Sequence, residues 1–207
     1  MKVSESDARL RVRMSERGVN WPLTSSCGRM FDAAAALILR RDRVDYEAQA
    51  AIELEGIAER DSAGLSGGYP LRLEDDGEPG SLGLNSTTMR QELLDLRSGE
   101  EPAKMSARFH AGVADAYVCG AIAARERTGI RDVCLSGGAF HNRLLAHLVC
   151  VRLRKAGMEI HLPILFSPGD GGLSYGQAVV AARIAEAARV KRNGGFRNTL
   201  LIWYAPR

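Results

Sequence analysis

The chain has 207 residues, of which 45% are apolar and 26% charged, which is the composition of an ordinary globular protein with a substantial core. The formal net charge is only +3 at pH 7, and no basic run with interleaved aromatics is present, so we expect no nucleic-acid partner. The opening residues are charged throughout, and no apolar run approaches the roughly 18 residues of a membrane span. We therefore expect no signal peptide, no membrane contact and a cytoplasmic location.

The four cysteines indicate neither a disulfide framework nor a zinc site. Cys27, Cys119, Cys134 and Cys150 form no C-x-x-C pair, and no histidine lies at zinc-finger spacing from them. Three of the four fall inside apolar periodic segments. We interpret them as buried free thiols of a protein from a reducing compartment.

The first half of the chain predicts helices around a middle segment that is rich in Gly, Asp and Pro. Helical patterns, in chain order, cover the first twenty residues up to a turn at 18–22, and then residues 30–41, 46–60, 87–96, 103–127, 139–156 and 173–188. In the segment 103–127 apolar residues recur at three- and four-residue spacing, which predicts one buried face. The middle segment, 61–83, predicts a β-hairpin or a loose excursion, with a turn at 76–77.

The last third of the chain alternates strands and helices. Residues 131–135 predict a short buried strand and residues 158–164 a second strand, and each is followed by a helix. This order is typical of parallel strands with right-handed crossovers. The fold class that follows is α/β, a parallel-sheet layer with flanking helices.

Each of these two strands runs into a glycine turn: Ser136-Gly137-Gly138 in the first case and Gly169-Asp170-Gly171-Gly172 in the second. Ligands of open α/β sheets bind beyond the carboxyl ends of the strands, and a helix that begins there presents free N–H groups. A single Gly-Gly pair is more often plain turn chemistry, whereas two turns on successive strands favour a shared ligand.

Two polar residues of these turns have two interpretations each. Asp170 is either a helix cap or a metal ligand beside phosphates. Asn142, in the following helix, is either a solvated polar residue or a hydrogen-bonding partner of a base or ribose.

Five segments, in order, carry a resemblance to a known family: GVNWPLTSSCGRMFDAAAAL, YEAQAAIELE, ARFHAGVADA, LSGGAFHNRLL and SPGDGGLSYGQAVVA. Together they resemble the C-terminal part of the HypF carbamoyltransferases of [NiFe]-hydrogenase maturation. The last domain of these enzymes is similar to TsaD, and both belong to the actin/Hsp70/sugar-kinase (ASKHA) superfamily. The resemblance implies an enzyme that makes carbamoyl-adenylate from carbamoyl phosphate and ATP. It then transfers the carbamoyl group to the C-terminal cysteine of a HypE-type partner.

The resemblance also implies a binding site for ATP or carbamoyl-adenylate, whose residues are carried over by position, with the catalytic residues left open. Gly28 and Asp32 correspond to phosphate and ribose contacts, Glu47 to a ribose contact, Gly137, Gly138 and Asn142 to the adenosine-contacting turn, and Asp170 to the carboxylate that reaches a divalent metal, Mg or Fe, near the phosphates. Because an acyl-adenylate is already activated, positioning and charge stabilisation would supply most of the catalysis.

The chain also departs from the family pattern. The acylphosphatase-like, zinc-finger and YrdC-like domains are missing, as are the phosphate loop of the first lobe and the H-x-x-x-H metal motif. Ala48 stands where the family has glycine. We divide the chain into a polar segment (1–20), a partial TsaD-like domain without its first lobe (21–190) and an unmatched tail (191–207). We expect it to be inactive alone and to form a homo-oligomer or to assemble with a separately encoded HypF N-terminal half.

Several residues and functions remain as alternatives. His110 is interpreted as a satisfied core or interface residue, Cys27 as a small buried residue rather than a nucleophile, and His141 and His147 as surface positions. A non-catalytic fragment or docking module of the same fold is the main alternative function. A distinct ASKHA kinase is disfavoured, because no residue has the pattern of a kinase base.

Overall fold

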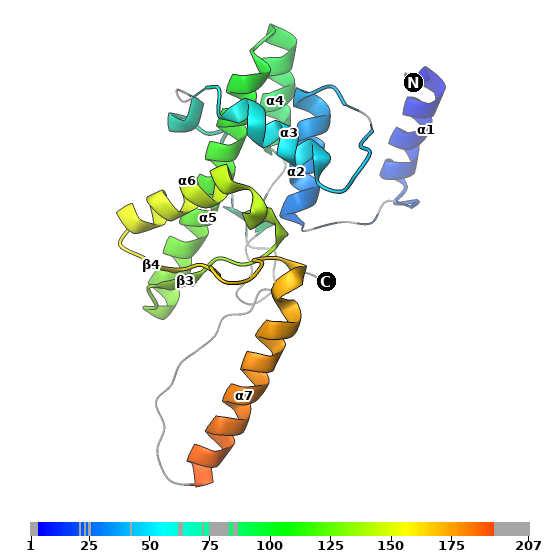
Figure 1. Cartoon of the computed structure of the whole chain (residues 1–207). Coiled ribbons are helices and arrows are strands. Elements are labelled where there is room, and N and C mark those ends of the chain that lie inside the picture. Colours follow the sequence, from blue (N-terminus) through cyan, green and yellow to red (C-terminus); the bar gives the residue numbers. More distant parts are fainter. Residues whose placement is uncertain are drawn as a thin grey trace.

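The computed structural model shows a body of packed helices, with one helix standing off at each end of the chain (Figure 1). It describes residues 4–192 apart from 21, 23, 25, 42, 62–63, 72, 75–82 and 85–86. The elements are α1 (Glu5–Glu16), α2 (Cys27–Ile38), α3 (Gln49–Ala58), η1 (Gly64–Ser66), β1 (Leu73–Glu74), β2 (Gly83–Leu84), α4 (Thr87–Ser98), α5 (Pro102–Thr128), β3 (Asp132–Cys134), η2 (Gly138–His141), α6 (Arg143–Lys155), β4 (Glu159–His161), η3 (Asp170–Gly172) and α7 (Leu173–Arg192).

Helix α5 is the centre of the body, and α2, α3, α4 and α6 all pack against it. It begins with Pro102 in its first turn and ends at Gly129, whose φ of 73° suits glycine. Residues 105–114 are buried with the sole exception of Arg108. The prediction of one buried face is therefore wrong for this stretch, because α3 and α6 both pack on it.

A close backbone approach fixes α5 against the loop that follows η1. A Cβ atom on Gly68 would lie 2.3 Å from the backbone nitrogen of Gly112, and a Cβ on Gly112 would lie 2.3 Å from the carbonyl oxygen of Tyr69. The backbone nitrogen of Tyr69 donates to the carbonyl oxygen of Arg108 at 3.0 Å. Only glycine allows the loop to lie this close to the helix.

The predicted strand–helix–strand unit is confirmed, but its sheet is small. Strands β3 and β4 pair in parallel, with Val133 opposite Ile160. Within β3, Val133 is half-buried while Asp132 and Cys134 are exposed, so the prediction of a buried strand is wrong. Strands β1 and β2 form the predicted antiparallel hairpin, whose turn at 76–77 lies outside the described residues.

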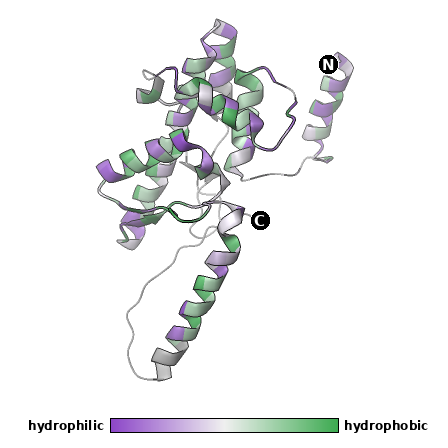
Figure 2. Cartoon of the chain, in the orientation of Figure 1, coloured by the Kyte–Doolittle hydropathy of each residue, from purple (hydrophilic) through white to green (hydrophobic). Residues whose placement is uncertain are grey.

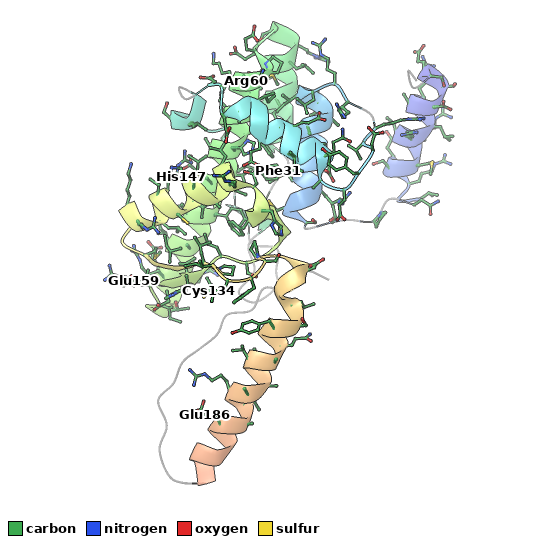
Figure 3. The ribbon with its side chains drawn as sticks, in the orientation of Figure 1. Phe31, Arg60, Cys134, His147, Glu159 and Glu186 are labelled. Atoms are coloured by element: carbon green, nitrogen blue, oxygen red, sulfur yellow. The ribbon has the colours of Figure 1, made fainter. Side chains whose placement is uncertain are left out.

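The four cysteines are free thiols, as predicted, but they are not uniformly buried. Cys150 is buried in α6 and Cys27 is partly covered, whereas Cys119 and Cys134 are exposed. Cys119 lies in the second half of α5, beyond the part that is enclosed by other helices. Figure 3 labels Cys134 on β3. The periodic apolar pattern around these two positions overstates their burial because the sheet has only two strands in the described part of the chain.

Both terminal helices stand off from the body in Figure 1, although α1 is close enough for Arg11 to line a pocket with residues of α2 and α4. Helix α1 buries none of its residues. Figure 2 shows hydrophobic residues along α7, and the segment before it is also uncovered, with Ile164 and Leu165 90% and 93% exposed. No helix in the described residues combines the length and the hydropathy that crossing a bilayer requires. The tail from residue 193 onward lies outside the described residues.

Helix α4 places a carboxyl group in the interior. Glu92 is fully buried, and neither of its carboxylate oxygens has a hydrogen-bond partner among the described residues. Its neighbour Asp95 accepts hydrogen bonds from the Tyr69 hydroxyl (2.8 Å) and from Arg108 (2.6 Å). Burial, together with the nearby Asp95, raises the pKa of Glu92 to about 8.

We expect stability to fall as the pH rises from 6.5 to 8. A raised folded-state pKa means that the folded protein keeps the Glu92 proton after the unfolded chain has lost it, so this stabilisation is complete at low pH and disappears by about pH 8. Burial lowers the pKa of His110 to about 4, which destabilises the fold in acid, so the two effects oppose each other below pH 6.5. Over the upper window the loss approaches about 2 kcal/mol. Urea denaturation of Glu92→Gln should show no such slope, and a slope unchanged from wild type would contradict the assignment.

Candidate functional site

The two glycine turns lie against each other and form one surface. The backbone nitrogen of Gly137 donates to the carbonyl oxygen of Pro168 at 2.7 Å, and the Ser136 hydroxyl donates to the same oxygen at 3.2 Å. Ser167, on the second turn, lies 3.2 Å from the Nε2 atom of His141. The predicted proximity of the turns is confirmed, as expected for the carboxyl ends of neighbouring parallel strands.

Because the turns are formed by glycines, few side chains cover the backbone of this surface. A Cβ atom on Gly169 would lie 3.3 Å from the Cα of Gly138 and 3.0 Å from the Nε2 of His141, so the turns could not approach as closely with a larger residue. A Cβ on Gly138 would meet nothing within 4 Å. Gly137 has a φ of 113°, which an L side chain rarely adopts. A flat ligand could therefore lie directly on the exposed backbone of Gly138.

The beginning of α2 lies beside the first turn. Helix α2 packs against η2, and Tyr117 connects them: its side chain hydrogen-bonds with the Cys27 thiol, and its ring centroid lies 5.3 Å from that of Phe140. Burial raises the pKa of the Cys27 thiol, and the Tyr117 hydrogen bond offsets this in part. Because the neutral thiol is favoured, the structure agrees with the interpretation of Cys27 as a packing residue rather than a nucleophile.

Helix α2 carries two of the predicted contact residues. Gly28 is exposed in its first turn, after the side chain of Ser26 caps the helix by accepting from the backbone nitrogen of Arg29. Asp32 lies one turn further along and pairs with Arg29 at 3.0 Å, with 37% of its side chain exposed. Figure 3 labels Phe31, which is buried and packs against the rings of Phe109 and His110. Both predicted residues therefore lie at the surface of α2, Gly28 exposed and Asp32 partly exposed.

The amino end of α6 is already occupied, which corrects the expectation that it presents free N–H groups. The Oε1 atom of Glu55, on α3, accepts from the backbone nitrogens of Arg143 (2.8 Å) and Leu144 (3.0 Å). The side-chain oxygen of Asn142 accepts from Leu145 at 2.8 Å. A carboxylate of the protein itself thus takes the position that an anionic ligand would otherwise take. No sequence pattern pointed to Glu55, because its partners lie more than 80 positions away.

Asn142 is engaged at both ends of its amide. With its oxygen on Leu145, its Nδ2 atom faces the Nε2 atom of His110 at 2.9 Å. The Nε2 atom must therefore accept, which leaves the proton on Nδ1 to be donated to the carbonyl oxygen of Ser106 at 2.8 Å. His110 is fully buried, which confirms its interpretation as a satisfied core residue. Through these two hydrogen bonds Asn142 connects the first glycine turn to the core.

The remaining predicted residues lie at the edges of this arrangement. Glu47 is exposed and lies just before the amino end of α3, whereas Glu55 lies in the carboxyl-terminal half of this helix. The residue of this region that contacts α6 is therefore Glu55 and not Glu47. Asp170 is exposed at the start of η3, and no cluster of three or more potential metal ligands occurs in the described residues. The described side chains do not by themselves form a divalent metal site. His141 and His147 are exposed, as predicted, and Figure 3 labels His147 on α6.

The fold and the two turns define a class: a helical α/β domain with an open glycine surface at the carboxyl ends of two parallel strands, the position at which α/β proteins bind ligands. Residues 1–177 match the family described as carbamoyltransferase, Kae1-like domain, second subdomain. The chain belongs to this family.

Individual relatives agree with this assignment. The carbamoyltransferase HypF homolog of Cupriavidus necator is 39% identical over 191 residues, which cover 90% of this chain and 48% of that protein. The carbamoyltransferase HypF of Rhizobium leguminosarum bv. viciae is 39% identical over 180 residues, covering 83% of this chain and 22% of that protein. The chain thus spans at most about half the length of these relatives.

The fold is also that of solved HypF structures. A full-length HypF in its phosphate- and nucleotide-bound form superposes with a TM-score of 0.80 and 34% identity, over 89% of this chain and 24% of that one. The structure of T. kodakarensis HypF superposes with a TM-score of 0.70 over 87% of this chain and 23% of that chain; at 24% identity this shows the fold alone.

Proposed function

We propose that this chain is the nucleotide-binding C-terminal portion of a HypF-type carbamoyltransferase. The observation that carries the proposal is the joined glycine surface, with Gly138 open to a ligand and the start of α2 beside it. A purine would lie on the backbone of Gly138, and the Asp32 carboxylate would accept from ribose hydroxyls. Family membership supports the same assignment.

The proposed reaction moves a carbamoyl group from carbamoyl-adenylate to the C-terminal cysteine of a HypE-type acceptor protein in [NiFe]-hydrogenase maturation. The acceptor sulfur, having lost its proton, bonds to the carbamoyl carbon, and the bond from that carbon to the phosphate oxygen breaks, so that AMP leaves. The substrate is already activated, which explains why no general base is required of this surface. The contribution of the chain is to hold the adenylate in place.

A divalent metal, Mg or Fe, would neutralise phosphate charge if Asp170 and ligands from outside this chain bound it together. Because the described residues offer Asp170 without companion ligands, no step is assigned to the metal.

The exposed apolar surface of α7 and of residues 164–165 is proposed to be covered by the remaining part of a HypF-type protein, such as a separately encoded N-terminal half. Self-association of this chain is the other way to cover it. Sedimentation of the chain alone, and with a HypF N-terminal portion added, distinguishes the two.

Nucleotide binding tests the proposal directly. We expect AMP or ATP to bind in the micromolar range by calorimetry, and Gly138→Val to weaken binding at least about tenfold, because a side chain would occupy the space of the base. Asp32→Asn should weaken it as well, although it costs the fold only an exposed same-helix ion pair, worth at most about 0.5 kcal/mol.

The matched control is Gly176→Val on α7, where a Cβ atom also meets nothing within 4 Å, and it should leave nucleotide binding unchanged. Absence of binding even when the remaining HypF portion is supplied would reject the proposal in favour of a non-catalytic docking module.

A further inference from the structure

A second surface, away from the glycine turns, is lined by arginines. Arg11 of α1, Arg40 and Arg41 just after α2, and Arg97 of α4 surround a groove of about 710 Å³. Three other lining residues, Ala36, Leu37 and Leu96, form its apolar floor. We call this surface the arginine groove. It brings together residues that are separated by more than 80 positions in the sequence and that play no part in the proposed carbamoyl transfer.

Most of this positive charge is not neutralised by ion pairs among the described residues. Arg41 pairs with Glu53 at 2.8 Å, but no ion pair links Arg11, Arg40 or Arg97 to an acidic side chain within the described residues. All three side chains are exposed. Guanidinium groups repel one another, so a surface that gathers four of them, of which only Arg41 has a carboxylate partner among the described residues, is suited to an anionic ligand from outside.

The position of Arg40 supports an anionic ligand, because its backbone conformation favours glycine over arginine. It follows the C-cap of α2 with a φ of 51°, in the left-handed region where helices most often end with glycine. A non-glycine residue there costs about 1 kcal/mol or more. The chain nevertheless places an arginine at this point of the groove.

The shape and lining of the groove determine the kind of ligand. It is wide and open to solvent rather than enclosed, which suits a polypeptide segment better than a small molecule. Its floor of Leu37 and Leu96 offers apolar contact that an inorganic anion could not use, and no aromatic side chain lines it on which a nucleic-acid base could stack. We propose that the arginine groove docks an acidic, partly apolar segment of a partner protein.

The test measures binding of a fluorescein-labelled synthetic peptide of Glu and Leu by anisotropy at low ionic strength. We expect saturable binding that weakens with added salt, and each of Arg11→Gln, Arg40→Gly and Arg97→Gln should weaken it about 2- to 5-fold. The triple variant should lose more than about tenfold. Arg40→Gly is the decisive single variant, because it removes a guanidinium while placing glycine where the backbone favours it. Its thermal midpoint should equal or exceed that of wild type.

Arg127→Gln, an exposed arginine in the last turn of α5, is the matched control and should leave the affinity unchanged. No binding of the acidic peptide, or an equal loss in Arg127→Gln, would overturn the proposal. Tighter binding of a single-stranded oligonucleotide through the same arginines would overturn it in favour of nucleic acid, and equal competition by inorganic phosphate would overturn the peptide assignment. None of these outcomes depends on nucleotide binding at the glycine turns, so the two proposals fail separately.

Discussion

Replacing Gly112 with alanine is expected to lower the free energy of unfolding by about 3 kcal/mol. The added methyl group would lie 2.3 Å from the carbonyl oxygen of Tyr69, and the obstacle is backbone rather than the end of a flexible side chain. Relief requires the loop or α5 itself to move, in a region where residues 105–114 are almost entirely buried. Overpacking of such a site costs about 1–3 kcal/mol, and the upper end applies where backbone meets backbone.

The matched control for Gly112→Ala is Gly56→Ala. Gly56 also lies inside a helix, α3, but it is exposed and its Cβ position meets nothing within 4 Å. This change should stabilise the protein by about 0.5–1 kcal/mol, since alanine favours the helix. Urea denaturation of the two variants should therefore give changes of opposite sign. Equal effects would mean that the contact between Gly112 and Tyr69 does not hold the loop against α5.

The helices were predictable where the sequence contains a long periodic pattern with clear ends. The segment 103–127 predicts α5 within one residue at each end, since Pro102 and Gly129 mark the boundaries chemically. Helix α2 begins three residues before the predicted Met30 because the Ser26 hydroxyl caps it. The cap residue types were visible in the sequence, but which of several neighbouring hydroxyls caps a helix depends on backbone geometry.

The proximity of the two glycine turns was predictable for a general reason: parallel strands end at the same edge of a sheet. It was not predictable that a side chain of the protein itself would occupy the amino end of α6, next to the first turn. Glu55 lies on a separate helix, and its contact with Arg143 and Leu144 depends on how α3 packs across α5 and α6. Such pairing of distant residues leaves no periodic signal in a single sequence. The same is true of Gly68 and Gly112, which look like ordinary loop and helix glycines.

The occupied amino end of α6 limits what the first glycine turn offers to a ligand. Two helix ends were expected to offer positive charge to a phosphate, but Glu55 and Asn142 already accept from the first three backbone nitrogens of α6. Within the described residues, the first turn is therefore left with backbone surface, at Gly138, as its feature for a ligand. A flat ring can lie on such a surface, whereas a phosphate bound at a helix end needs free N–H donors.

Replacing Asn142 with alanine is expected to lower the free energy of unfolding by about 2–4 kcal/mol. Loss of the helix cap on Leu145 accounts for about 1 kcal/mol. The rest comes from His110, whose buried Nε2 atom loses its only hydrogen-bond donor among the described residues, a cost of about 1–3 kcal/mol. Urea denaturation at pH 7 measures the change, well above the pKa of about 4 that burial gives His110.

Ser26→Ala separates the two contributions to the Asn142→Ala effect. The Ser26 side chain also caps a helix of the body, accepting from the backbone nitrogen of Arg29 at 3.4 Å, but it has no buried histidine to satisfy. Its loss should cost about 1 kcal/mol or less. If Asn142→Ala costs no more than Ser26→Ala, the hydrogen bond between Asn142 and His110 contributes nothing to the fold. If it costs the larger amount, the glycine turn is held in place by the core of the protein through a single amide. Nitrogen chemical shifts of the His110 ring in wild type should then show a protonated Nδ1 and an unprotonated Nε2 at pH 7, with Nε2 gaining a proton only below about pH 4.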